Sequence, residues 1–387
     1  MEHCFHLEYV NFKPFLKIIS FHSKIIDKNI INKKMLFRKV IKNFFIKIIF
    51  IFFFIFLNIT IKKKKRIGVI SVRHEVNIGN NLLKYAIFIK LSELGFIPYI
   101  IGTHWNNYNI SFINRTTNLI IIKNNFSEIK QNDYDILMVN SDQTWRRFDE
   151  HFYDYAFLNF TKNWKIKKFI YGASLGFDYW TLTPDDEKIA KYLLKNFNGI
   201  SVREKDSIEL IKKHIGVHPL LVLDPTLLID KKYYLNLIKY YKSNNTINNK
   251  YIFIYSIGKN NNMKTFMKES NLKLNYTIYE YYLNNKSTIE EFIYHMTKCS
   301  AVITNSYHGT IFSILFNKPF VTFCNKNGEY QRFLTLEYLF GIEKRIFDYN
   351  QNPNCNLLME PLKINYYLVN KIKKESIKYI KINLGLE

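Results

Sequence analysis

Residues 301–323 read AVITNSYHGTIFSILFNKPFVTF and predict a strand, a polar loop, a helix and a second strand in immediate succession. The apolar residues Ala301–Thr304 indicate the first strand, Thr310–Asn317 the helix and Pro319–Phe323 the second strand. A strand–helix–strand unit of this length is typical of a parallel sheet. Residues 305–309, NSYHG, interrupt this apolar segment, where burial of polar groups would be costly. They form either a tight turn or a functional loop.

The same order of elements recurs upstream. Residues 66–71 (RIGVIS) predict a strand, 82–95 (LLKYAIFIKLSELG) a helix that ends in glycine, and 96–102 (FIPYIIG) the next strand. Further strands are predicted in the segments YDILMV (134–139), KFIYGAS (168–174), GISV (199–202), PLLVL (219–223) and KYIFIYS (250–256).

An Asn-rich break, YYKSNNTINNKY (240–251), separates two such sets of elements and is interpreted as an interdomain linker. The pattern therefore predicts two open α/β domains of the Rossmann-like type, at 66–240 and 250–345, and a C-terminal helical tail at 346–387. A length of 387 residues also favours two domains. The carboxyl ends of the two sheets would face each other across a cleft.

Residues 1–65 form an apolar and basic N-terminal extension. The uncharged run Ile48–Ile61 is shorter than the roughly 20 residues that a membrane-spanning helix needs. Basic residues flank it on both sides, so its orientation is not defined. It is a short membrane anchor, an interfacial helix on anionic lipid, or an extension unrelated to the fold. The basic flanks favour peripheral or anchored contact with the cytoplasmic face of the inner membrane.

The formal net charge of +24 comes mainly from lysines scattered along nearly the whole chain. Because no zinc finger, RNA-binding signature or leucine zipper accompanies it, this charge favours a solvated basic surface over nucleic-acid binding. The four cysteines contain no CxxC pair, and no cluster of His or carboxylates indicates a metal site. The chain also lacks the GxSxG, P-loop and GxGxxG motifs. We expect a cytoplasmic protein without a tightly bound cofactor.

Ligands of open α/β sheets bind beyond the carboxyl ends of the strands, so polar residues at those ends are site candidates. His308 is the most informative of them, because it lies next to a predicted helix N-terminus, where anions bind. The alternative is a structural histidine in a strand–helix turn. The full set of polar strand-end residues is His74, Asn77, Asn140, Ser141, Asp142, Ser174, Arg203, Asp224, Ser256, Asn305 and His308.

Seven segments resemble, in content and order, the motifs of the polysaccharide pyruvyl transferase family. The resemblance covers about Arg66 to Arg345. The chain departs from the family at Asn305, where an acidic residue is usual, at Asn140, where Gly is usual, and at Ser306, where some members have Arg. The segments are VNIGNNLLKYAIFIKLSELG (76–95), NSDQTW (140–145), YGASLG (171–176), SVREKDS (201–207), VLDPTLL (222–228), NSYHGTIFSILFNKPFV (305–321) and RFLTLEYLFGIEKR (332–345).

The resemblance implies a GT-B-like fold and transfer of pyruvate from phosphoenolpyruvate to a sugar as a cyclic ketal. The acceptor would be a cell-surface glycan or its lipid-linked precursor. It also implies His308, Arg203 and Asp142 as catalytic residues. The substrate-binding residues that it implies are Asn77, Gly79, Asn80, Ser141, Gln143, Ser174, Asn305, Ser306, Gly309 and Arg332.

Each role has a chemical basis and an alternative. Arg203 can clamp a carboxylate or phosphate with its planar fork, or form a weak surface ion pair with Glu204. His308 can donate to a phosphate oxygen or protonate the methylene carbon of the donor. Asp142 can accept a proton from a sugar hydroxyl, or cap the turn after its strand. Trp145 stacks on a sugar or packs in the core.

Two other functions remain open at this point. A nucleotide-sugar glycosyltransferase shares the two-domain plan and would bind a nucleoside diphosphate. A non-catalytic glycan-binding module would bind its ligand without releasing phosphate, and the departures at Asn305 and Ser306 are compatible with it.

Overall fold

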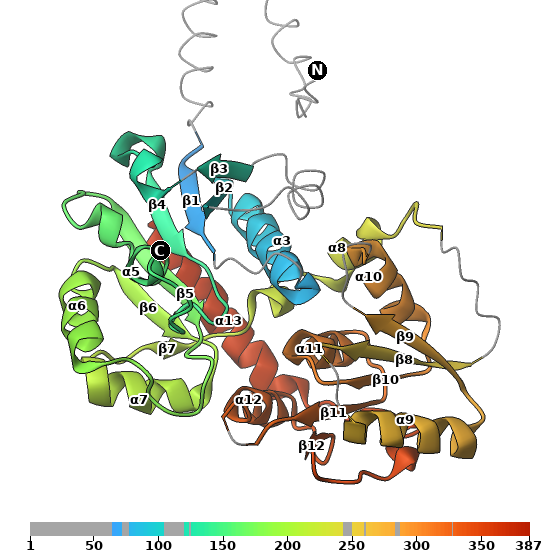
Figure 1. Cartoon of the computed structure of the whole chain (residues 1–387). Helices are drawn as coiled ribbons and strands as arrows, with labels where there is room; N and C mark the ends of the chain where they lie inside the picture. Colours follow the sequence, from blue (N-terminus) through green and yellow to red (C-terminus); the bar gives the residue numbers. More distant parts are fainter. Residues whose placement is uncertain are drawn as a thin grey trace, which may run out of the picture. The chain divides into compact units, whose positions relative to one another are not determined.

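The computed structural model describes residues 64–71, 77–103, 120–123, 125–242, 250–258, 261–282, 287–326 and 328–387 (Figure 1). The apolar run of the N-terminal extension and His74 lie outside these residues. Residues 64–387 form one compact unit, which contains both sheets.

The first sheet consists of seven parallel strands among the described residues, in the order β3-β2-β1-β4-β5-β6-β7. Because the strand order reverses between β1 and β4, the crevice at their carboxyl ends is where this topology places a ligand. The strands are β1 (Arg66–Ile70), β2 (Ile97–Thr103), β3 (Ile120–Lys123), β4 (Ile136–Val139), β5 (Lys167–Ala173), β6 (Gly199–Val202) and β7 (Leu220–Leu221).

Helices of the first half alternate with these strands. They are α3 (Ile78–Glu93), α5 (Phe152–Phe157), α6 (Pro184–Leu194), α7 (Lys205–Ile215) and α8 (Lys231–Leu237), with short 3-10 turns η1 (Phe126–Glu128), η2 (Gln131–Asp133), η3 (Asn159–Thr161) and η4 (Pro225–Leu227). All four residues of β4 are buried, which explains why its sequence is apolar throughout rather than alternating.

The second sheet has five parallel strands among the described residues, in the order β12-β11-β10-β8-β9. Its strands are β8 (Tyr251–Ser256), β9 (Thr277–Tyr282), β10 (Ala301–Thr304), β11 (Phe320–Cys324) and β12 (Ile346–Asp348). Its helices are α9 (Asn261–Leu274), α10 (Ile289–Lys298), α11 (Tyr307–Leu315) and α12 (Gln331–Phe340), with the turn η5 (Cys355–Leu358). Two Rossmann-like domains are therefore present, as the sequence predicts.

Helix α11 begins at Tyr307, three residues before the predicted start at Thr310. Ser306 is its N-cap, because the Ser306 Oγ accepts a hydrogen bond from the Gly309 N–H at 3.3 Å. His308 is consequently in the first turn of the helix and not in a loop.

The last helix, α13 (Tyr366–Leu384), returns to the first sheet (Figure 1). The Tyr379 hydroxyl donates to the Ile170 carbonyl at 2.7 Å, and the Ser376 Oγ accepts from the Leu223 N–H at 2.9 Å. The segment predicted as a helical tail, 346–387, thus starts with a strand of the second sheet and ends with a helix on the first.

One apolar core joins the two halves. Tyr234 of α8 lies between Tyr85 of α3 and Phe312 of α11, with ring centroids 6.2 and 5.0 Å away. This packing brings the N-termini of α3 and α11 together between the sheets (Figure 1).

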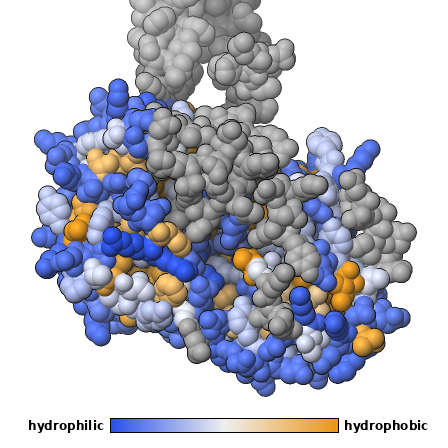
Figure 2. Space-filling view, viewed as in Figure 1, coloured by the Kyte–Doolittle hydropathy of each residue, from blue (hydrophilic) through white to orange (hydrophobic). Residues whose placement is uncertain are grey.

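The face of the molecule drawn in Figure 2 is mostly hydrophilic, with hydrophobic residues in small scattered groups. Within the described part of the chain, no helix is both long enough and apolar enough to cross a bilayer.

Candidate active site

His308 lies against the first turn of α3. A Cβ atom at Gly79 would be only 2.2 Å from the His308 Nδ1, so this close approach requires glycine. Asn77 fixes the start of α3, because its side-chain oxygen accepts from the Gly79 N–H at 2.9 Å. The His308 imidazole, from the second domain, is therefore buried against a helix N-terminus of the first domain.

Arg203, directly after β6, is the centre of a buried cluster of charges. Its Nη1 is 2.8 Å from Asp224, its Nη2 is 3.1 Å from Asp142 and its Nε is 3.0 Å from Glu204, while only 1 % of its side chain is exposed. Burial alone would lower the pKa of Arg203, but the three carboxylates outweigh this effect and raise it. Every nitrogen of its fork thus already faces a carboxylate.

Asp142 connects this cluster to α3. Its Oδ2 accepts from the Asn80 Nδ2 at 2.6 Å, while its Oδ1 faces Arg203. The backbone of Asp142 has a φ of 112°, in the region that favours glycine. Strained backbone of this kind is characteristic of functional sites, where the surrounding structure holds it in place.

Asp224 connects the cluster to His308. Its Oδ2 is 3.7 Å from the His308 Nε2, within ion-pair range but beyond a hydrogen bond. Burial would raise the pKa of Asp224, but His308, Arg203 and Thr226 outweigh burial and hold it well below its usual range. The His308 Nε2 itself has no hydrogen-bond partner among the described residues.

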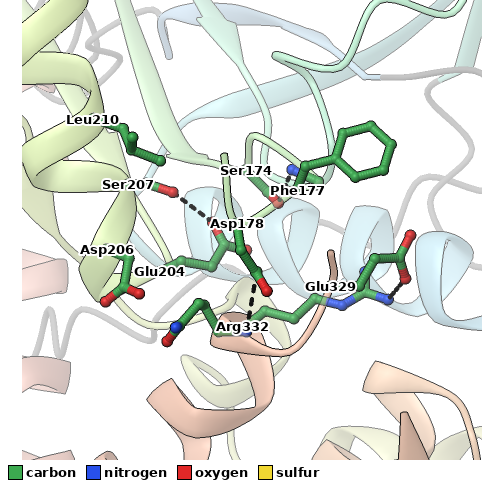
Figure 3. Close-up of a pocket in the computed structure, with 11 residues that line it drawn as sticks. Ser174, Phe177, Asp178, Glu204, Asp206, Ser207, Leu210, Glu329 and Arg332 are labelled. Carbon is green, nitrogen blue, oxygen red and sulfur yellow. Dashed lines mark hydrogen bonds and ion pairs between the residues drawn. The ribbon is translucent and has the colours of Figure 1, made fainter. Parts of the chain in front are cut away.

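A pocket of about 280 Å³, including the part open to solvent, lies beside the cluster (Figure 3). Glu204 is the carboxylate of the cluster that lines it, and burial raises the pKa of Glu204 despite the nearby Arg203 and Arg332. Arg332 is the cation in its wall, and the Arg332 Nε is buried without a partner among the described residues. The lining residues are Ser174, Gly176, Phe177, Asp178, Glu204, Asp206, Ser207, Leu210, Glu329, Gln331 and Arg332.

A family model described as polysaccharide pyruvyl transferase matches residues 77–327, which include β4, the Arg203 cluster and α11. The chain belongs to the polysaccharide pyruvyl transferase family. It is accordingly a transferase. No curated protein matches it.

Solved structures resemble the chain in fold. A UDP-N-acetylglucosamine 2-epimerase superposes with a TM-score of 0.50 and 10 % identity, over 84 % of this chain and 98 % of the other. A UDP-GlcNAc 2-epimerase from Neisseria meningitidis gives 0.47 and 10 %, over 83 and 93 %. A glycosyltransferase from Rickettsia africae gives 0.44 and 13 %, over 84 and 95 %. At such identities the likeness concerns the GT-B-like arrangement of two Rossmann-like domains and not the activity.

The pyruvyl transferase motifs are brought together only in part. The structure gathers His308, Arg203, Asp142, Gly79 and Asn80 in the cluster, and it places Ser174 and Arg332 in the pocket wall.

Other residues of the predicted site form hydrogen bonds to neighbouring segments of the same chain. The Asn305 side chain pairs with both the N–H and the C=O of Ile257, at 2.7 and 2.9 Å. Ser141 donates to the Gly172 carbonyl, and Gln143 accepts from Arg146. Asn77 and Ser306 are helix N-caps, and Gly309 packs where a Cβ would be 2.2 Å from the Thr304 hydroxyl.

Two interpretations from the sequence are decided by burial. The interpretation of Arg203 and Glu204 as a surface ion pair is wrong, because both side chains are buried. Trp145 is fully buried and packs edge-on against Phe157, so it belongs to the core and cannot stack on a sugar in this conformation.

Sequence reasoning included Asp224 among the strand-end candidates but gave it no role, and it missed Glu204 and Asp178 as site residues. Asp224 caps η4 and also holds Arg203. Asp178 and Glu329 are far apart in the sequence and line one pocket only in the folded chain, so no local pattern marks them. Within the described ranges, no group of three or more His, Cys, Asp or Glu could hold a metal ion.

Proposed function

We propose that this transferase moves pyruvate from phosphoenolpyruvate to two hydroxyl groups of one sugar, forming a cyclic ketal and releasing inorganic phosphate. The observation that carries the proposal is the contact of His308 with Gly79 above the Arg203 cluster, in a chain of the pyruvyl transferase family. It places an imidazole whose Nε2 makes no hydrogen bond to the described residues at the meeting point of two helix N-termini.

The reaction needs only acid–base chemistry. The double bond of the donor takes a proton at its methylene carbon, and a sugar hydroxyl adds to the neighbouring carbon and loses its proton. Phosphate then leaves with the electrons of its C–O bond, and a second hydroxyl closes the ring. Of the two hydroxyl protons, one balances the proton added to carbon and the other leaves with the phosphate. No tightly bound cofactor is needed.

His308 is assigned the proton transfer, because its Nε2 has no hydrogen-bond partner in the described structure and lies 3.7 Å from the Asp224 carboxylate. Arg203 is assigned a positioning role, because its fork is already occupied by carboxylates. Arg332 replaces it as the candidate for binding the donor's anionic groups. Asp142 as the acceptor of a sugar proton stays a prediction, and its bonds to Asn80 and Arg203 also fix the site's geometry.

The acceptor is proposed to be a glycan or a lipid-linked saccharide, which suits a transferase of this family. We further propose that the reaction takes place in the cytoplasm, at or near the inner membrane, where the basic and apolar N-terminal extension would make contact.

The test is phosphate release from phosphoenolpyruvate with a panel of saccharide acceptors. His308→Ala should lower kcat by roughly 10²–10⁴-fold, the range for a positioned acid or base. His308→Gln should bind the donor but remain slow, because glutamine can donate a hydrogen bond but cannot transfer the proton. His218→Ala, at an exposed histidine, is the matched control.

All variants must keep the melting temperature of the wild type. If His308→Ala melts early while its folded fraction turns over normally, His308 is structural and the proposal is wrong. Stabilisation by UDP-sugars but not by phosphoenolpyruvate would instead favour a nucleotide-sugar glycosyltransferase.

A further inference from the structure

Helix α12 of the second domain is not capped by the residue at its N-cap position. This residue, Tyr330, has helical backbone angles, and its side chain makes no capping hydrogen bond. The first turn of α12 also contains no acidic residue. The carboxylate of Asp178, from the first domain, takes this place. It accepts from the Tyr330 N–H at 2.9 Å and from the Gln331 N–H at 3.1 Å. A charged acceptor at a helix N-terminus forms strong hydrogen bonds.

Further contacts join the same two segments. The Asp178 N–H donates to the Gly328 carbonyl at 2.9 Å, and Arg146 reaches Glu329 at 3.4 Å. The Arg146 guanidinium also lies over the Phe177 ring, 4.3 Å from its centroid. The loop after β5 and the start of α12 are thus tied together by backbone and side-chain bonds. Figure 3 shows Asp178 between the two domains at the pocket.

Arg332 projects from the first turn of α12. Its Nη2 is 2.6 Å from Glu329, and its guanidinium lies 5.5 Å from the centroid of the Tyr307 ring. The same ring is 4.8 Å from the Arg203 guanidinium. The position of Arg332 relative to the buried cluster therefore depends on where α12 begins, and Asp178 fixes that point.

We propose that Asp178 is a positioning residue for the transfer reaction, which latches the two domains by capping α12 and so holds Arg332 toward the anionic donor. The inference rests on the proposed function for the identity of the donor. It goes beyond that function because it makes the position of Arg332, the cation in the pocket wall, depend on a contact between the domains.

The test separates a latch from a mere helix cap. Asp178→Ala removes both the cap and the contact between the domains, whereas Asp178→Ala combined with Tyr330→Asp puts a carboxylate of the second domain at the start of α12, where it interacts favourably with the helix dipole. We expect the single variant to melt about 2 °C lower and the double variant to regain the wild-type value. The dissociation constant for phosphoenolpyruvate, measured by calorimetry, should rise at least about tenfold in both. Asp185→Ala, at an exposed α6 aspartate, is the matched control.

A double-mutant cycle tests whether Asp178 acts on donor binding through Arg332. In an Arg332→Ala background, Asp178→Ala should weaken phosphoenolpyruvate binding by less than about twofold, because the group that Asp178 positions is already gone. A further tenfold loss in that background would overturn the proposal. Wild-type affinity in the Asp178→Ala/Tyr330→Asp variant would also overturn it.

Distances measured between the two domains test the Asp178 latch independently of the identity of the donor. Spin labels at Lys195→Cys and Lys268→Cys, both exposed, report them in full-length protein with Cys4→Ser, because Cys299, Cys324 and Cys355 are buried. The distribution should broaden in both Asp178 variants, and an unchanged one overturns the latch. If the wild type fails to bind phosphoenolpyruvate, the donor assignment falls and this measurement alone decides the latch.

Discussion

The carboxyl edges of the two sheets carry similar polar residues but use them differently. At the first sheet, Asp142, Arg203 and Asp224 follow three different strands, and both aspartates form ion pairs with Arg203. At the second sheet, Asn305 and Ser306 bond to backbone close by. The first edge is held together by charges between strands, whereas the second is held by amide and hydroxyl groups that complete the ends of β8 and α11.

This difference shows that a polar residue after a strand has two distinct uses. Ionised groups buried at such an edge must find partners, and their partners come from neighbouring strands. Neutral side chains can instead satisfy the backbone groups that the strand or helix leaves open. The sequence position is the same in both cases, so substitutions must separate them.

The largest effect is expected from Arg203→Met, which leaves three carboxylates buried without their cation. Breaking a buried ion pair from one side costs about 3–5 kcal/mol. We therefore expect the free energy of unfolding in urea to fall by about that amount. Lys188→Met removes only an exposed ion pair and should change it by less than about 1 kcal/mol. Equal effects of the two substitutions would mean that the cluster is not a stabilising unit.

A smaller effect is expected from Gly79→Ala. The added methyl group would collide with His308, so the imidazole must move and kcat should fall by about 100-fold. Unfolding free energy should also drop by about 1–3 kcal/mol, as for overpacking. The Gly79→Ala/His308→Gly variant should be as stable as His308→Gly alone, because glycine removes the whole His308 side chain, including the Cβ that the added methyl group would meet at 2.6 Å. Additive losses in the double variant would contradict the contact.

The smallest effect is expected from Asn305→Ala at the second edge. Loss of its two bonds to Ile257 should lower the free energy of unfolding by about 1–2 kcal/mol. Affinity for phosphoenolpyruvate should stay within about twofold of wild type, because the side chain faces backbone. A large loss of affinity at unchanged stability would instead make Asn305 a substrate-binding residue, as its motif implies.

The alternation of strands and helices could be predicted, because strands such as β10 are buried and therefore apolar throughout. The start of α11 could not, since Tyr307 and His308 are polar residues that the fold buries in a first turn. Strand β12 has only three residues, too few for a periodic signal. These errors concern short or capped elements, where tertiary contacts outweigh local pattern.

For the site, the sequence indicated His308 and Gly79 separately but not their contact. That contact depends on how α3 and α11 pack through Tyr234. Likewise, Arg203 could be placed after its strand and beside Glu204, but its partners Asp142 and Asp224 depend on the strand order β4-β5-β6-β7. The order of strands within a sheet is a property of the topology and cannot be derived from a single sequence.

The return of α13 to the first sheet affects how the chain is made. During synthesis, β5 and β6 leave the ribosome long before Tyr379 and Asn383, which cover them. The first domain therefore cannot complete its packing until the second has been translated, and it is exposed to chaperones and proteases in the meantime. A fragment that stops at residue 242 would lack one of the layers of the first domain. Expression of the two halves as separate chains would need α13 to be attached to the first.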